Sequence, residues 1–286
     1  MGLKYGENPM ERLLLVAILT CFIHLINTLI YSVRVAGVRT GRLAIALTLF
    51  NVIFLLSSTA NMIQGPFLGT IVDKAIKIGG ADVTTMAYQE QLGILSGDIR
   101  LIILFGTLGT LLGLLLMPAF VKVFVKAIVV FEHAGSISKM LTIAIFKPRT
   151  IKELAQKKLA QPTMESTIQY QGIPKGLLVT NVVVTAVFTI GVLAAVYAGA
   201  LYPDFRSTTN FMASIVNGIA QILLATIVDP AAARITDQAL RGVRAEAEVM
   251  QLSRFLALTR LAGTLLAQLL FLPAAYLIKF VATMIT

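Results

Sequence analysis

Several arginines in this sequence lie inside or near apolar stretches, where a guanidinium group has few possible partners, and three of them are candidates for binding an anion. Arg260 lies within an apolar run near the C-terminus, and Arg34 and Arg39 follow an apolar run near the N-terminus. A guanidinium fork binds phosphate oxygens through two parallel hydrogen bonds. We therefore expect these side chains to bind an anionic group such as a phosphate. The alternative for Arg34 and Arg39 is that they only orient the chain in a membrane.

Uncharged polar side chains recur at helical spacing within the same apolar runs. From Thr20, polar residues follow at i+4, i+7, i+11 and i+14, which places them on one face of a helix. The members of such faces that we expect to bind substrate are His24, Asn27, Asn61, Gln64, Asn217, Gln221 and Gln268. Together they predict a polar cavity between helices. The alternative is that they hold membrane helices together by hydrogen bonds, and for His24 a proton relay is a further reading.

Motifs typical of enzymes are absent from the sequence. It has no GxxxxGK(S/T) phosphate loop and no HExxH, CxxC or GxSxG, so we expect neither ATP hydrolysis nor another enzymatic activity. The one cysteine, Cys21, excludes an intrachain disulfide. The two histidines are too few for a histidine-rich metal site. We accordingly expect no cofactor and no metal.

The elements that must position these side chains are membrane-spanning helices. Of the 286 residues, 57% are hydrophobic and 13% are charged, a composition too apolar for a soluble protein. A segment that crosses a membrane satisfies its backbone hydrogen bonds only as a helix or in a closed barrel. Six runs are long enough to span as helices, namely 13–33, 43–72, 101–121, 177–201, 211–228 and 255–281.

The lysines and arginines outside these spans are unevenly distributed. Sixteen of the 24 lie in the first, third and fifth loops, so the net charge of +10 is interpreted as a membrane signal, with no nucleic-acid partner. The positive-inside rule places those loops in the cytoplasm and both termini outside. Within the third loop, 127–146 and 151–160 predict amphipathic cytoplasmic helices, the second with a Glu153/Lys157 pair at i,i+4.

Two parts of the chain resemble each other. NMIQGPFLGTIVDKA, from Asn61, corresponds to NGIAQILLATIVDPA, from Asn217, and GTLLGLLLMPA, from Gly109, corresponds to GTLLAQLLFLPA, from Gly263. The alternative is that helices of similar composition resemble each other by chance. Three spans in each copy would invert the second copy, as in many alternating-access transporters. We predict a first three-helix repeat at 1–128, cytoplasmic helices and a linker at 129–175, and a second, inverted three-helix repeat at 176–286.

The repeat also places an aspartate at one end of the second span of each copy. We expect these residues, Asp73 and Asp229, to act in coupling or gating, together with Gly65 and Pro66 inside the second span. A proline within a helix removes a hydrogen bond and clashes with the preceding turn, so a kink or a break is expected there. Gly65 and Gly109 each begin a GxxxG spacing, which permits either a homodimer or close packing inside one chain.

The stretch SVRVAGVRTGRLAIALTLFNVIFLLSSTANMIQGPFLGTIVD, at 32–73, resembles the signature of the Amj (alternate to MurJ) family of bacterial lipid II flippases. ITDQALRG at 235–242 and RLAGTLLAQLLFLP at 260–273 resemble the same family. The resemblance implies a multi-pass protein of the bacterial cytoplasmic (inner) membrane that moves lipid II from the inner to the outer leaflet. The implied partners are lipid II, which is anchored by undecaprenyl pyrophosphate, and membrane lipids. The open alternatives are a flippase for another polyprenyl-linked lipid, an ion-coupled small-solute transporter, and a non-transporting scaffold.

Overall fold

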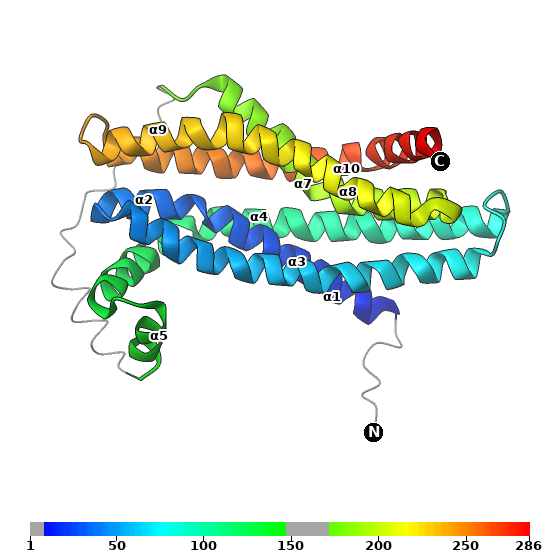
Figure 1. Ribbon diagram of the computed structural model, residues 1–286, viewed down its shortest axis with the longest axis horizontal. Helices are drawn as coiled ribbons and strands as arrows, with labels where there is room; N and C mark the ends of the chain where they lie inside the picture. Colours follow the sequence, from blue (N-terminus) through cyan, green and yellow to red (C-terminus); the bar gives the residue numbers. More distant parts are fainter. Residues whose placement is uncertain (1–8, 147–171) are drawn as a thin grey trace.

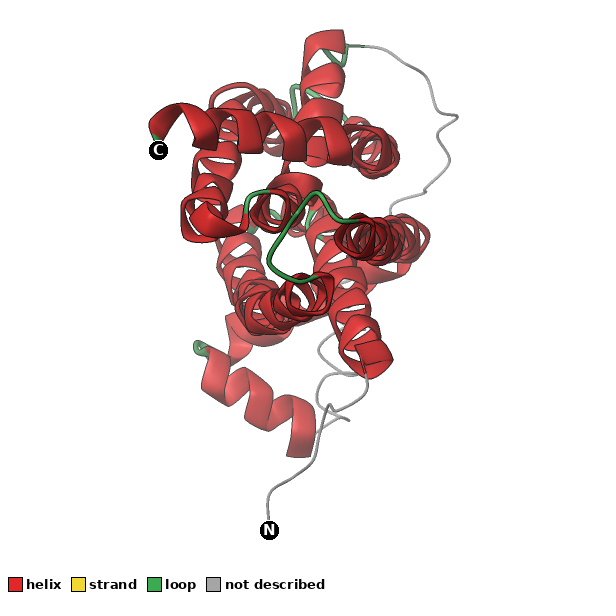
Figure 2. Ribbon diagram, turned by 90° about the vertical axis from the view of Figure 1, so that its right-hand side faces the viewer, coloured by secondary structure: helices red, strands yellow, loops and turns green. Residues whose placement is uncertain are grey.

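The computed structural model describes residues 9–146 and 172–286, and this part of the chain is helical without strands (Figures 1 and 2). The first half contains α1 (Pro9–Leu29), α2 (Tyr31–Thr40), α3 (Leu43–Gly79), α4 (Met86–Ala134) and α5 (Ile137–Phe146). The second half contains α7 (Lys175–Leu201), α8 (Arg206–Leu223), α9 (Asp229–Leu240) and α10 (Glu246–Ile285). Within the described residues, 6 helical stretches are long and apolar enough to cross a membrane, with α1–α2 and α8–α9 each forming one. The predicted all-helical, six-span architecture is confirmed.

The helices extend beyond the apolar runs that predicted them. α4 begins at Met86 rather than near residue 101, so Arg100 lies inside a helix and not in a loop. α4 also continues to Ala134, and the predicted boundary at residue 129 therefore falls within it. Its 49 residues reach about 74 Å at 1.5 Å per residue, so its ends must project beyond a ~30 Å hydrocarbon core. The predicted helix at 151–160 and its Glu153/Lys157 pair lie outside the described residues.

Proline has different effects at the two corresponding helices of the predicted repeat. α3 is one continuous helix through Pro66, so of the expected kink or break, the break does not occur and the kink stays a prediction. In the second half, a π-helical segment (Leu224–Val228) directly precedes Asp229 and Pro230. The N–H of Asp229 donates to the carbonyl oxygen of Leu224. This wider turn relieves the clash between the proline ring and the carbonyl four residues before it.

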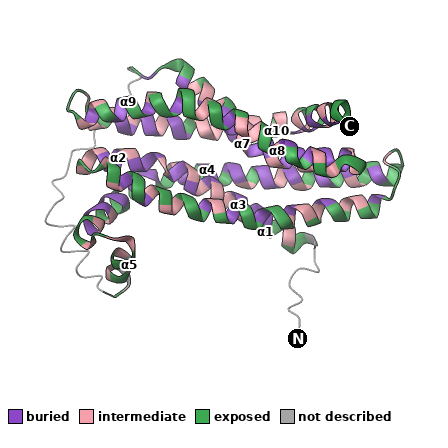
Figure 3. Ribbon diagram, in the orientation of Figure 1, coloured by how far each residue is buried: buried purple, intermediate pink, exposed green. Residues whose placement is uncertain are grey.

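Two apolar cores lie at opposite ends of the bundle, and each contains side chains from both halves of the chain. Buried residues occur along the whole length of the bundle (Figure 3). The core at the α2 end, on the left of Figure 1, includes Ile128 and Leu252. The core at the opposite end includes Ile102 and Phe271. On α1, α3, α4, α7 and α10, a level of polar side chains separates the two cores. We call this level the polar layer, and it consists of Thr20, His24, Asn27, Thr28, Ser57, Gln64, Thr107, Thr110, Asn181, Thr185, Thr189, Arg260 and Thr264.

Corresponding glycines make the same kind of close contact in both halves. A Cβ added to Gly109 of α4 would lie 2.1 Å from the carbonyl oxygen of Cys21 on α1. A Cβ added to Gly263 of α10 would lie 2.6 Å from the carbonyl oxygen of Val182 on α7. In each half, the GTLL segment of the last long helix therefore packs against the first helix. This equivalence agrees with the predicted repeat; the repeat itself, its inversion and the location of the termini outside stay predictions.

Replacing Gly109 with alanine is expected to destabilise the protein by about 1–3 kcal/mol or more, because α1 and α4 must separate to admit the methyl group. Gly65→Ala is the matched control, since nothing lies within 4 Å of a Cβ added there. Thermal unfolding of the purified protein in detergent measures both effects. We expect a lower Tm for Gly109→Ala and little change for Gly65→Ala; equal Tm values for Gly109→Ala and wild type would contradict the close packing.

The GxxxG spacings that begin at Gly65 and Gly109 have different surroundings. Gly109 and Gly113 pack against α1 within the same chain, whereas a Cβ added to Gly65 or Gly69 of α3 would meet nothing within 4 Å. Of these two spacings, the one on α3 is therefore the one available to a second copy of the chain. The homodimer stays a prediction.

Candidate substrate-binding site

His24 lies in the middle of the polar layer, where α1 faces α4. Its side chain is 7% exposed, and its Nδ1 lies 3.3 Å from the hydroxyl oxygen of Thr110. The Thr110 hydroxyl donates to the carbonyl oxygen of Gly106 at 3.0 Å. Because a hydroxyl has one proton to donate, a simultaneous bond to His24 requires the Nδ1–H to be the donor. In the neutral ring, Nε2 is then an acceptor.

Arg260 brings a positive charge into this layer from α10. The residue is half-buried, its buried Nε has no hydrogen-bond partner, and none of the ion pairs within residues 9–146 and 172–286 involves it. It lies within electrostatic reach of His24. A buried donor without a partner costs about 1–3 kcal/mol, and an arginine at the membrane centre costs ~2.5–3.5 kcal/mol on insertion scales. An anionic ligand would provide both the missing acceptor and the missing charge.

Three further predicted binding residues lie at or beside the polar layer. The Ser57 hydroxyl of α3 donates to Asn27 Oδ1 of α1 at 3.2 Å. Gln64 is 8% exposed, and its Oε1 has no hydrogen-bond partner in the part of the chain that the structure describes. The same holds for Asn217 Oδ1 of α8, and this amide occupies the space that Gly191 leaves on α7. The unpartnered acceptors of Gln64 and Asn217 are free to receive hydrogen bonds from a ligand.

Other predicted residues lie away from these groups. Asn61 and Gln221 are exposed on α3 and α8, as are Gly65 and Pro66. Gln268 is engaged within the chain, because its Nε2 donates to the carbonyl oxygen of Arg100 and its own carbonyl accepts from Arg100 Nη1, both at 2.9 Å.

Arg34 and Arg39 of α2 each bind a carboxylate from the other half of the chain. Arg34 Nη2 lies 3.1 Å from Oδ1 of Asp229, the first residue of α9. Arg39 Nε donates to Oε1 of Glu246, the first residue of α10, at 2.8 Å. The second pair is the more buried one, with 10% of the Arg39 side chain exposed. Both arginines therefore join the halves at the α2 end and must exchange partners to bind another anion.

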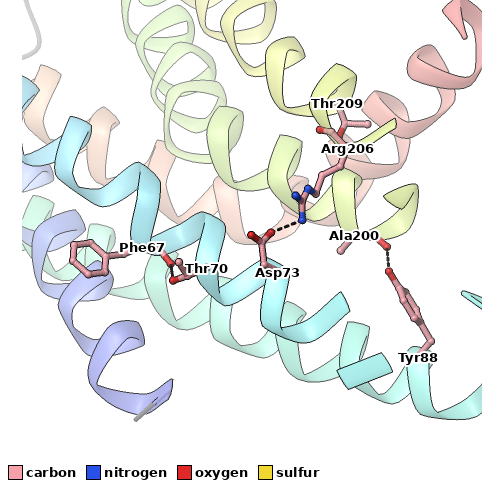
Figure 4. Close-up of polar contacts among 7 residues, drawn as sticks. All are labelled: Phe67, Thr70, Asp73, Tyr88, Ala200, Arg206 and Thr209. Atoms are coloured by element: carbon pink, nitrogen blue, oxygen red, sulfur yellow. Dashed lines mark hydrogen bonds and ion pairs between the residues drawn. The ribbon is translucent and has the colours of Figure 1, made fainter. Parts of the chain in front are cut away.

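A corresponding contact joins the halves at the opposite end of the bundle. Asp73 of α3 forms an ion pair with Arg206, the first residue of α8 (Figure 4). Beside it, the Tyr88 hydroxyl of α4 donates to the carbonyl oxygen of Ala200 on α7 at 2.7 Å (Figure 4). The two aspartates of the repeated TIVD strings, Asp73 and Asp229, thus each bind an arginine of the other half, and they do so at opposite ends.

Sequence reasoning missed Asn181, which connects three helices within the polar layer. Its side chain is 1% exposed, and its Nδ2 donates to the Leu256 carbonyl at 2.9 Å and to the Thr259 hydroxyl at 2.8 Å. Its Oδ1 accepts a hydrogen bond from the Tyr31 hydroxyl at 3.4 Å. A lone asparagine in an apolar run was the available signal, because an amide inside a membrane needs partners. Arg206 and Glu246 gave no such signal.

The polar layer offers groups that can bind an anionic, polar ligand. It combines one unpaired cation with neutral hydrogen-bonding groups. Among the residues that the structure describes, no three His, Cys, Asp or Glu side chains are arranged to hold a metal ion.

Known proteins match this chain over nearly its whole length. The model of the Amj family, described as "Alternate to MurJ", matches residues 19–282. A protein of Bacillus subtilis (strain 168) named "Lipid II flippase Amj" is 39% identical over 265 residues, covering 91% of this chain and 94% of the relative. No solved structure matches the chain. The family match includes every member of the polar layer and all three ion pairs between the halves.

Proposed function

Because this chain belongs to the Amj family, we propose that it translocates lipid II from the inner to the outer leaflet of the bacterial cytoplasmic membrane. Lipid II consists of a pyrophosphate, a disaccharide-peptide headgroup and a polyprenyl tail. Its carrier must therefore bind anionic and polar groups inside the membrane while the tail stays in lipid. The observation that carries this proposal is the unpaired, half-buried Arg260 in a polar layer between two apolar cores.

In this proposal, residues in and beside the polar layer each bind a different part of the headgroup. Arg260 binds the pyrophosphate, because its planar fork matches two phosphate oxygens. Gln64 and Asn217 offer free acceptors to the hydroxyl and amide donors of the sugar and peptide. These contacts replace water around the headgroup, so that its polar groups are not left unsatisfied in the apolar interior.

The headgroup reaches this layer by alternating access, in which two inverted halves rock against each other. Among the described residues, three ion pairs link the halves: Arg34–Asp229 and Arg39–Glu246 at the α2 end, and Asp73–Arg206 at the other. The Arg34–Asp229 and Asp73–Arg206 pairs are partly exposed, and exposed ion pairs contribute only about 0–1 kcal/mol, so either can break while the opposite end stays closed. The more buried Arg39–Glu246 pair opens when another anion replaces its carboxylate. With the α2 end in the cytoplasm, Arg34 and Arg39 would exchange their carboxylates for the arriving pyrophosphate.

The direct test is rescue of bacteria depleted of their essential lipid II flippase. We expect expression of this chain to restore both growth and lipid II in the outer leaflet. An Arg260→Ala variant inserted at the same level is the matched control and should restore neither. Failure of the stably inserted wild-type protein to restore either would contradict lipid II as the cargo; restored growth without outer-leaflet lipid II would favour a supporting role over transport.

A further inference from the structure

An apolar groove runs along the first half of the chain, between α1–α2, α3 and α4. It has a volume of about 270 Å³, and every side chain that lines it is apolar. Four phenylalanine rings contribute to the lining, those of Phe22, Phe50, Phe120 and Phe124. Phe22 is 41% exposed, so the groove opens to the outside of the bundle. In a membrane, this opening faces lipid and not water.

The groove lies at the junction of α1 and α2. α1 ends at Leu29, and the N–H of Val33 donates to the carbonyl oxygen of Ile30 at 3.1 Å, a tighter turn than in an α-helix. Leu29, Ile30 and Val33 all line the groove. The junction thus turns side chains from two successive helices toward the same space.

The groove also adjoins polar groups on both sides. Ile26 and Leu56 line it, and each directly precedes a residue of the Asn27–Ser57 hydrogen bond in the polar layer. Toward the α2 end, the lining residue Val33 directly precedes Arg34. Lining residues of the groove are thus directly followed along the chain by an uncharged polar pair in the polar layer and by an arginine toward the α2 end.

We propose that this groove holds the first part of the polyprenyl tail of the lipid substrate while the headgroup occupies the polar layer. The inference rests on the proposed function and adds a binding site for the tail. The arginine and the polar layer suit an anionic headgroup, and the neighbouring apolar groove suits the tail attached to it. Together these surroundings match an amphiphile with an anionic headgroup. Isoprene units carry a methyl branch and a double bond, so they fill a wide aromatic groove better than a straight acyl chain does. At about 270 Å³, near the lower end of the ~300–1,000 Å³ of ligand pockets, the groove fits a segment of the tail.

Photolabelling tests the occupant directly. The protein is placed in phosphatidylethanolamine/phosphatidylglycerol vesicles with undecaprenyl pyrophosphate that carries a diazirine in the isoprene units next to the pyrophosphate. We expect labelled peptides from the groove helices, and loss of this label with excess unlabelled undecaprenyl pyrophosphate. Phosphatidylglycerol with a diazirine in its acyl chain is the comparison. Equal labelling of the groove by this probe, without competition by the polyprenyl lipid, would overturn the proposal in favour of an ordinary lipid contact.

A pair of variants on α3 tests the groove separately from the cargo. Leu56→Trp fills the groove, whereas Leu55→Trp places the same ring on a neighbouring residue that does not line it; the two leucines are 57% and 63% exposed. The surrounding lipid tails are as apolar as the groove, so the tail gains little by entering it. We therefore expect Leu56→Trp to bind undecaprenyl pyrophosphate with an apparent affinity only three- to tenfold lower than the wild type, where tenfold corresponds to about 1.4 kcal/mol. Leu55→Trp should bind like the wild type. Equal binding by both variants would overturn the groove site.

The outcomes also separate this inference from the proposed function. Competable labelling of the groove in a protein that does not move lipid II would overturn the cargo and keep the tail site. Lipid II transport with labelling spread evenly over the outer helix faces would keep the function and overturn the tail site.

Discussion

An Arg260→Ala variant is expected to lose most lipid II translocation while remaining folded and inserted. The lost contact is a hydrogen-bonded pair of charges, worth about 1.5–3 kcal/mol, which corresponds to a roughly ten- to hundredfold decrease in transport at limiting lipid II. Stability should stay equal or rise, because the variant removes a half-buried cation whose Nε has no partner. This combination distinguishes a binding role from a structural one, since loss of a structural arginine would lower the Tm.

The measurement uses purified protein in vesicles that contain lipid II, with a membrane-impermeant reagent to detect outer-leaflet lipid II. Arg254→Ala is the matched control, because Arg254 lies on the same helix but outside the polar layer. Arg260→Lys keeps the charge and loses the planar fork, so we expect an intermediate rate. Normal transport by an Arg260→Ala, Arg39→Ala double variant would contradict the proposed role of these arginines in pyrophosphate binding.

The sequence predicts the helices of this protein better than the contacts between them. Apolar runs identified all six spans, because a segment inside a membrane must form helix to satisfy its backbone. The ends were missed where a charged residue interrupts the apolar run inside a continuous helix. Arg100, for example, interrupts the hydropathy pattern but not the helical backbone of α4.

Helical spacing shows which residues share a face but not what that face contacts. The spacing that begins at Thr20 correctly grouped it with His24, and both are buried in the polar layer. Similar spacing on α3 and α8 drew attention to Asn61 and Gln221, which are exposed. Their environment depends on how the halves pack, and this information is absent from a single helix.

The partners of charged residues were also beyond sequence reasoning. Arg206 lies 133 residues from Asp73, and Glu246 lies 207 residues from Arg39. No local pattern connects residues at such separations. The internal repeat still pointed to the two important aspartates, because the repeated TIVD string placed Asp73 and Asp229 at equivalent positions.

Linking the halves covalently at the end with Asp73 and Arg206 is expected to reduce transport to the background rate. Both residues are replaced by cysteine in a Cys21→Ser background, which removes the one native cysteine. The two side chains form an ion pair between α3 and α8, so a short bifunctional thiol reagent should connect the new cysteines. If the halves must separate at this end to release lipid II, a covalent link stops every cycle, whereas loss of the ion pair alone has a small effect.

A link within one half provides the control. Arg244 and Glu248 form an ion pair at 2.7 Å on the second half alone, so the same reagent on cysteines at these positions should leave transport unchanged. A cleavable reagent should restore the Asp73→Cys, Arg206→Cys protein to its rate before treatment, which excludes damage by labelling. Undiminished transport by a fully cross-linked protein would mean that the halves do not separate at this end. In that case, the headgroup would have to cross along the outer surface of the bundle, and the ion pairs between the halves would be structural.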